Sequence, residues 1–272
     1  MGERHGRGEL VIGGALLVLL VGMALVGPHL VRADPQAVDL AARLAGPTAA
    51  HPLGRDALGR DLLARLCHGA RLSLAIAGAA TVLSVALGVA VGAVAGWFGG
   101  WVDAVLARVI DVVLAFPGLL LAIALAAVLG PAPGHTVIAL TALGWTGYAR
   151  LARAQVTSLK HRDFVAAARA VGRRDAAILV RHLLPLAAPL LLVQATFGLS
   201  GAVLAEASLS FLGLGTPPPR PSWGAMLDEG RLFMLVAPHV VVVPAVALAL
   251  TVLGLQLAGD GLRDRLDLRD DG

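Results

Sequence analysis

The sequence predicts an all-α integral membrane protein with about six transmembrane helices, and two observations support this prediction. Hydrophobic residues make up 57% of the 272 residues and charged residues only 15%, with a mean hydropathy of +0.80. Soluble domains are roughly 45–50% apolar and about 25% charged. The apolar residues also form uninterrupted runs, and a helix needs about 20 of them in succession to cross a hydrocarbon core of about 30 Å. These features exclude an ordinary soluble domain.

The first apolar run covers residues 10–31 and follows a short basic segment, residues 1–9. A secretory signal peptide is the alternative interpretation, but its apolar region is normally only about 7–15 residues long. The exit from the run, residues 28–32, also lacks a clear small-x-small cleavage site. We therefore expect a retained transmembrane helix, followed by a polar external segment over 32–71.

A transmembrane domain is expected over residues 72–257. Its second span, 72–98, contains Gly88, Gly92 and Gly96 at a spacing of four, which places three small residues on one helix face. Such spacing permits close helix–helix approach in membranes.

The remaining spans are less regular. The third span, 105–129, contains Pro117, which predicts a kink or a discontinuity. The fourth span is short, and two prolines stand near the start of the fifth. The fourth, fifth and sixth spans are expected over 136–149, 183–207 and 232–257, with an external loop at 208–231 and a charged tail at 258–272.

Basic residues indicate the orientation, because cytoplasmic loops carry an excess of Lys and Arg. If the N-terminus is cytoplasmic, the segments 1–9, 97–108, 149–182 and 258–272 are also cytoplasmic and hold 14 of the 22 basic residues. Both termini are therefore predicted inside. The sequence pI of 10.4 is better explained by these flanking residues than by nucleic-acid binding.

The loop 150–182 is the most polar part of the predicted domain. Asp163 is a suitable N-cap for a helix of about two turns, and Gly172 is a suitable stop. Asp175 would cap a second helix that enters the membrane at Pro185. So short a helix is marginal in water and needs a packing partner.

This loop resembles the EAA loop of importer-type ABC transporter permeases, in which Glu-Ala-Ala is followed at fixed distances by Gly and by Ile-x-Leu-Pro. The chain has the same spacing in Ala166-Ala167-Ala168, Gly172 and His182-Leu183-Leu184-Pro185. Ala166 replaces the glutamate and His182 the isoleucine. Alanine is the best helix former, so the first change keeps the helix while removing an acid from the expected interface. A generic basic cytoplasmic loop is the alternative interpretation.

Other segments resemble the dipeptide, oligopeptide and nickel permeases of the same class. They occur in order from about residue 50 to 266, at 51–61 (HPLGRDxxGRD), 111–117 (DVVLAFP), 206–215 (EASLSFLGLG), 221–224 (PSWG) and 259–264 (GDGLRD). One long segment between the first two spans is typical of the C-type permease of that family. The resemblance implies a type I ABC importer permease in the bacterial cytoplasmic membrane.

The resemblance also implies the partners: a second homologous permease, two cytoplasmic ABC ATPases and an external solute-binding protein. ATP and Mg would be bound by the ATPases. The sequence agrees with this division of labour, because a P-loop requires G-x-x-x-x-G-K-[ST] and the sole lysine, Lys160, lies outside any such pattern. We expect no cofactor, metal or catalytic residue in this chain, which would be a transport subunit and not itself an enzyme.

The expected cargo is peptides or related small solutes, with nickel or glutathione as the alternatives for the same architecture. A secondary transporter is less favoured, because no internal repeat with paired broken helices is evident. Contact with the ATPase is implied for Asp163, Ala166, Ala167, Ala168, Arg169, Gly172 and Arg173.

Polar residues within or near the spans are further candidates. Asp111, Gln194 and Glu206 are candidates for the pathway or for structural pairing, because polar groups are costly in lipid. For the two acids a structural role is favoured over substrate contact. Ser222, Trp223 and Gly224 are candidates for contact with the binding protein or for gating the outer mouth.

Overall fold

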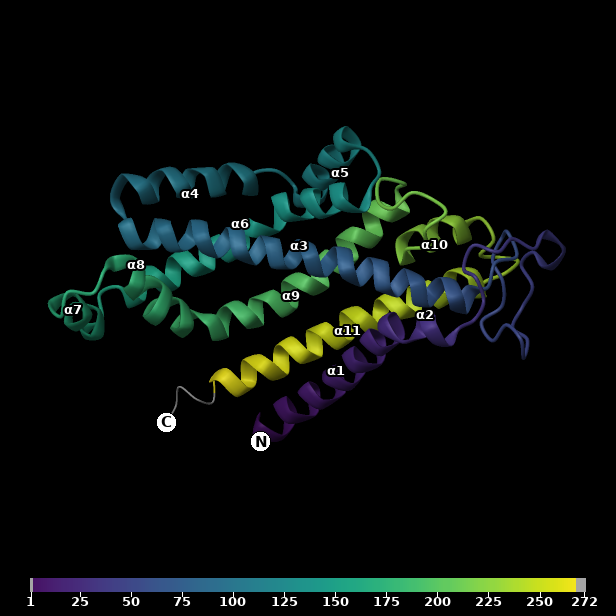
Figure 1. The fold of residues 1–272 in the computed structure, drawn as a ribbon, viewed down its shortest axis with the longest axis horizontal. Coiled ribbons are helices and arrows are strands. Elements are labelled where there is room, and N and C mark those ends of the chain that lie inside the picture. Colours follow the sequence, from purple (N-terminus) through teal and green to yellow (C-terminus); the bar gives the residue numbers. More distant parts are fainter. Residues whose placement is uncertain (1, 268–272) are drawn as a thin grey trace.

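The computed structural model describes residues 2–267 and is an elongated bundle of helices (Figure 1). The long helices are α1 (Gly2–Leu25), α3 (Leu62–Phe98), α6 (Pro133–Leu159), α9 (Leu184–Phe211) and α11 (His239–Asp267). The shorter ones are α2 (Gly27–Leu30), η1 (Leu40–Ala42), α4 (Gly100–Leu114), α5 (Gly118–Leu129), α7 (Asp163–Ala170), α8 (Asp175–Ile178), a π-helical turn η2 (Leu179–Leu183) and α10 (Trp223–Arg231). No strand is formed within residues 2–267, in agreement with the predicted all-α class.

Four helical segments are long and apolar enough to cross a membrane: Gly8–Leu25, Leu62–Phe98, Asp175–Phe211 and His239–Leu266. The pair α4 and α5 gives a fifth if it counts as one span, and its two helices meet at 83°. The break lies at Pro117, which precedes α5 and cannot continue the hydrogen bonding of α4. The predicted discontinuity in the third span is therefore confirmed, whereas the number of six spans stays a prediction.

Several helix boundaries differ from the predicted spans. The second span begins ten residues earlier, because the Asp61 carboxylate accepts a hydrogen bond of 2.7 Å from the Ala64 amide and caps α3. The fourth predicted span is only part of α6, which continues to Leu159 through residues assigned to the cytoplasmic loop. The helix of the sixth span starts at His239, seven residues later than predicted.

The glycines of α3 explain its close packing against α6. A Cβ at Gly88 would overlap with the Trp145 carbonyl oxygen, and one at Gly92 with the Ala149 carbonyl oxygen. At Gly96 a Cβ would lie only 2.7 Å from the Arg153 carbonyl oxygen. Because glycine has no side chain, residues at this spacing let the backbones of α3 and α6 come into contact. The predicted close approach is therefore confirmed.

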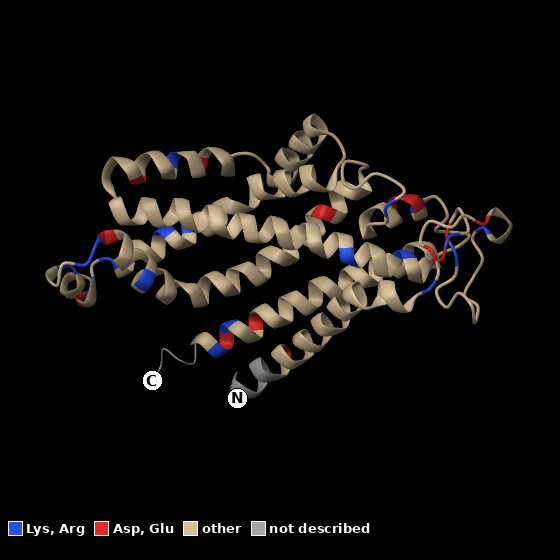
Figure 2. Cartoon of the chain, in the orientation of Figure 1, with Lys and Arg blue, Asp and Glu red and all other residues tan. Residues whose placement is uncertain are grey.

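Charges gather at the two ends of the bundle and on the last turns of α11, and the long helices carry few charges elsewhere (Figure 2). One end holds the loop after α2, the start of α3 and α10; the other holds α7 and α8. Helices α1, α4 and α9 run from the α7 end towards the other, and α3, α6 and α11 run back (Figure 1). The described ends of α1 and α11 lie side by side in the half of the molecule that holds α7.

Candidate coupling surface and transmembrane site

Helix α7 ends in a hydrogen-bonded glycine turn. The Gly172 amide donates to the Arg169 carbonyl (2.9 Å), and the Arg173 amide donates to the Ala168 carbonyl (3.1 Å). Gly172 has φ +77°, so this is a Schellman motif with glycine in the left-handed conformation. Gly172 therefore ends the helix as predicted.

The predicted N-caps of α7 and α8 are wrong by one residue. Arg162 and Arg174 are the N-caps, neither with a side-chain cap hydrogen bond, and Asp163 and Asp175 are the first residues inside the helices. Aspartate in the first turn still favours the helix through the positive end of the helix dipole.

One face of α7 is fixed to the bundle. Val165 is fully buried and Ala168 nearly so, and both pack in a cluster with Trp97 of α3 and Val156 of α6. The Arg169 guanidinium also lies over the Trp97 ring, 4.9 Å from its centroid. Such a contact adds about 0.5–1 kcal/mol at an exposed site.

The other face of α7 is exposed. Ala166, Ala167, Gly172 and Arg173 are all on the surface, and Val171 is 77% exposed. Of the motif alanines only Ala168 faces the bundle, so the first two are available to another protein. Phe164 and Arg169 flank this outer face, and the alanines between them leave room for another protein to approach the helix closely.

A π-helical turn connects this surface to α9. The Leu184 amide donates to the carbonyl of Leu179, five residues earlier, and Pro185 follows at the start of α9. Proline has no amide proton and its ring collides with the carbonyl four residues before it, so the wider turn accommodates Pro185. The chain nevertheless stays helical from Asp175 to Phe211.

Glu206 lies near the far end of α9 and is fully buried. The Ser210 hydroxyl donates to one of its carboxylate oxygens at 2.8 Å. One of the two carboxylate oxygens is therefore hydrogen-bonded within α9. The other carboxylate oxygen, Oε2, is buried without a hydrogen-bond partner among the described residues, and the role of Glu206 stays a prediction.

Ser222, Trp223 and Gly224 lie in the interior at the start of α10. Ser222 caps that helix by accepting from the Ala225 amide at 3.3 Å. Trp223 is fully buried, and its indole N–H donates to the Leu66 carbonyl of α3 at 3.1 Å. A Cβ at Gly224 would overlap with the backbone of Ala207 in α9.

These contacts bind α10 to both α3 and α9. The Trp223 side chain is therefore not on the surface in this conformation, and a role of this segment at the outer mouth stays a prediction. This burial could not be predicted from the sequence, because tryptophan in a Pro-rich loop is also typical of an exposed interface.

The motif at 51–61 forms a network of ion pairs next to α10. Asp56 pairs with Arg60 at 2.6 Å and lies 3.2 Å from Arg65, and Glu229 of α10 contacts both arginines. Arg65 is 1% exposed, yet it is an arginine inside a membrane-length helix. The dense charge pattern of this motif is the sign of such a network in the sequence, because charges are too costly to bury unpaired.

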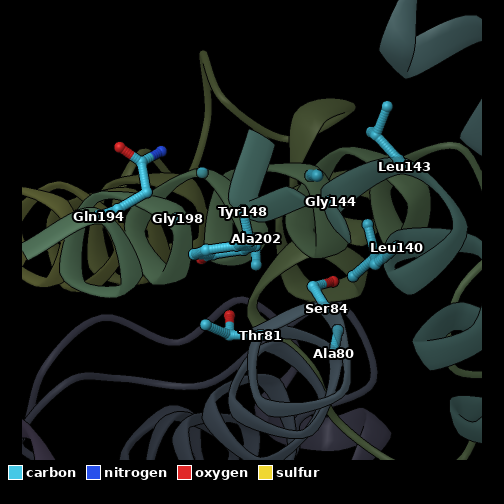
Figure 3. Close-up of a pocket in the computed structure, with 12 residues that line it drawn as sticks. Ala80, Thr81, Ser84, Leu140, Leu143, Gly144, Tyr148, Gln194, Gly198 and Ala202 are labelled. Atoms are coloured by element: carbon cyan, nitrogen blue, oxygen red, sulfur yellow. The ribbon is translucent and has the colours of Figure 1, made fainter. Parts of the chain in front are cut away.

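A mostly apolar pocket of about 260 Å³, with a few polar side chains, lies between α3, α6 and α9 (Figure 3). Gln194, predicted as a pathway candidate, lies at its edge together with Tyr148 and Gly198. Its deeper wall contains Thr81 and Ser84 of α3. Sequence reasoning missed these, because single hydroxyl residues in three separate spans carry no local signal.

Asp111 does not join any of these groups. Its side chain is exposed on α4 and interacts electrostatically with Arg153 of α6, without a side-chain hydrogen bond or an ion pair within residues 2–267. The candidate residues are thus distributed over the coupling surface on α7, the pocket and the buried contact of α3, α9 and α10, and they do not form one site.

This arrangement is that of a transport subunit: apolar membrane-length helices, a short exposed helix at one end and an uncharged pocket between three of the long helices. Residues 88–269 match the family described as binding-protein-dependent transport system inner membrane component, and the chain belongs to that family.

Two relatives are similar to the chain over most of its length. The chain is 50% identical over 222 residues to the glutathione transport system permease protein GsiD of Shigella flexneri, covering 82% of this chain and 73% of the relative. It is 46% identical over the same length and coverage to the protein of that name from Escherichia coli O157:H7. The chain is therefore a permease subunit of an ABC importer of the peptide and nickel family.

Proposed function

We propose that this chain is the C-type permease of an ATP-driven importer and that α7 receives the motion of a partner ATPase. The observation that supports this most directly is the two-sided structure of α7. Val165 anchors its inner face in the bundle, and Ala166 and Ala167 leave its outer face smooth and exposed. A push on the outer face passes through Gly172 and the π-helical turn to α9, which reaches the opposite end of the bundle.

The proposed topology has six spans, with α4 and α5 as one broken span and α6 as another. Support comes from the directions of the helices, which alternate along the chain between the two charged ends (Figures 1 and 2). The α7 end would face the cytoplasm together with both termini, in agreement with the excess of basic residues in those segments. The location would be the bacterial inner membrane.

The proposed assembly contains a second homologous permease, two cytoplasmic ATPases that bind ATP and Mg, and an external solute-binding protein. The absence of the P-loop pattern from the sequence supports a separate source of energy. The names of the relatives support glutathione, or a related small peptide, as the cargo.

Blocking the outer face of α7 tests this proposal. Ala167→Trp places a large side chain on that face, so we expect the variant to insert into the membrane but to lose most ATP-driven uptake in proteoliposomes and most co-purification of the ATPases. The matched control is Ala49→Trp, since Ala49 is also exposed but lies at the opposite end of the molecule. Normal uptake and co-purification with Ala167→Trp would contradict the assignment of α7.

A further inference from the structure

The pocket between α3, α6 and α9 has a mostly apolar wall that carries a few uncharged polar groups. Its twelve lining residues include no Asp, Glu, Lys or Arg. The polar groups are the hydroxyls of Thr81, Ser84 and Tyr148 and the amide of Gln194, and the rest of the wall consists of Gly, Ala and Leu. In Figure 3 Thr81 and Ser84 lie on one side of the pocket, and Gln194 lies at its edge with its amide turned away from them.

The Tyr148 hydroxyl has no hydrogen-bond partner among the residues that the structure describes. Its side chain is only 4% exposed, and its oxygen lies against Gly198, where a Cβ would overlap with it. Buried polar groups are almost always hydrogen-bonded, so an unpaired one requires an explanation. Gly198 gives the hydroxyl room on the α9 side, at the boundary of the pocket.

The α3 side of the pocket supplies complementary groups. The Thr81 hydroxyl donates to the Ala77 carbonyl at 2.8 Å, which leaves its oxygen as an acceptor. Ser84 is 3% exposed and has a hydroxyl that both donates and accepts. The pocket therefore offers donors and acceptors together, without a charge.

The volume of the pocket and its lack of charge limit the kinds of ligand that can bind there. A volume of about 260 Å³ is several times the roughly 30 Å³ that a water occupies in the liquid. An isolated ion would be costly against this uncharged wall. A peptide amide, with one N–H and one carbonyl, matches the groups present.

We infer that this pocket is a binding subsite for the neutral amide portion of a peptide substrate, with the charged ends of the substrate outside it. Tyr148 donates to the substrate carbonyl once α9 and α6 shift, and Thr81 accepts from the substrate N–H. The inference rests on the proposed importer function and names the part of the substrate that the permease itself recognises.

Cysteine protection in the assembled transporter in proteoliposomes tests the subsite. The reporter is Gly201→Cys in a Cys67→Ala background, because Gly201 lines the pocket, is exposed and has open space for a side chain. We expect millimolar S-methylglutathione, which has no free thiol, to slow its labelling by a maleimide. Glutamate, which has the same ionic groups but no peptide amide, should not slow it.

The matched control is Gly147→Cys, an exposed glycine of α6 that also has open space but does not line the pocket. No protection of Gly201→Cys, equal protection of Gly147→Cys, or equal protection by glutamate would each overturn the inference. The labelling is measured without ATP. Failure of the proposed coupling would instead appear as a loss of ATP-driven uptake while this protection persists.

A second variant tests the hydroxyl itself. Tyr148→Phe keeps the ring, so we expect the reporter to label normally while the concentration for half-protection rises by roughly threefold to tenfold, the effect of losing one neutral hydrogen bond. Thr251→Val removes a buried hydroxyl of α11 outside the pocket and should leave that concentration unchanged. If the concentration for half-protection were unchanged in Tyr148→Phe, Tyr148 would not be part of the subsite.

Discussion

Gly172 provides a test of the proposed coupling role through a single backbone conformation. Its positive φ allows the chain to turn sharply out of α7, and no atom outside its own neighbours lies within 4 Å of the position a Cβ would take. A side chain there would meet no clash and only backbone strain. The strain costs about 1–2 kcal/mol for an L-residue, and less for Asn.

We therefore expect Gly172→Leu to insert into the membrane but to reduce the ratio of solute transported to ATP hydrolysed. Gly172→Asn should retain most of that ratio, because asparagine tolerates the left-handed conformation. The measurement is uptake and ATP hydrolysis in the same proteoliposomes. Normal coupling in Gly172→Leu, or an equal loss in Gly172→Asn, would show that backbone conformation at this position does not control coupling.

Trp223 is the largest fully buried side chain in the described part of the protein. Truncation of a buried Phe or Trp to Ala typically costs about 3–5 kcal/mol. Trp223→Phe keeps most of the volume and loses the bond to Leu66, which is worth about 1 kcal/mol. We expect thermal unfolding in detergent to occur at a lower temperature in the order wild type, Phe, Ala; an Ala variant as stable as wild type would contradict the packing role.

Whether the role of a residue could be predicted depended on how far apart in the sequence its partners lie. Gly172 was identified from sequence because an alanine-rich helix and its glycine stop are neighbours in the chain. The burial of Trp223 was not, because its partners Leu66 and Ser73 are 157 and 150 residues away. The same reason explains why Thr81 and Tyr148 were missed as members of one pocket.

The helices themselves were predicted better than their ends. Apolar runs and Pro117 located the spans and the break between α4 and α5, since both act within one element. The extent of α6 was underestimated, because Arg150 and Arg153 suggested a loop. In the structure α6 stays helical through both arginines, and Arg153 hydrogen-bonds to Asp103 of α4.

The contact of α3 with α6 provides a test at the level of elements. Gly92→Leu would force a side chain into the α6 backbone at Ala149, so we expect a loss of about 1–3 kcal/mol or failure to fold. Gly78→Leu is the matched control, because Gly78 lies on the same helix with nothing within 4 Å of its Cβ position. Thermal stability in detergent measures both; equal values would contradict glycine-mediated packing.

At the scale of the whole molecule, the path of the chain through the membrane determines which end faces the ATPases. If the N-terminus is cytoplasmic, a topology of six spans places the residues near Gly134 outside and α7 inside. If only the four longest apolar segments cross, both positions lie inside. If the α4–α5 pair crosses and α6 does not, both lie outside.

Two cysteines therefore distinguish the three topologies. Gly134→Cys and Ala167→Cys are each made in a Cys67→Ala background, since the native cysteine is the only one and both sites are exposed. With a membrane-impermeant maleimide we expect Gly134→Cys to label in intact cells and Ala167→Cys only after lysis. Labelling of both in intact cells would support five spans, and labelling of neither would support four. Either result would move α7 or the α5–α6 turn to the wrong side for the proposed importer, because a helix that receives a push from a cytoplasmic ATPase has to lie in the cytoplasm.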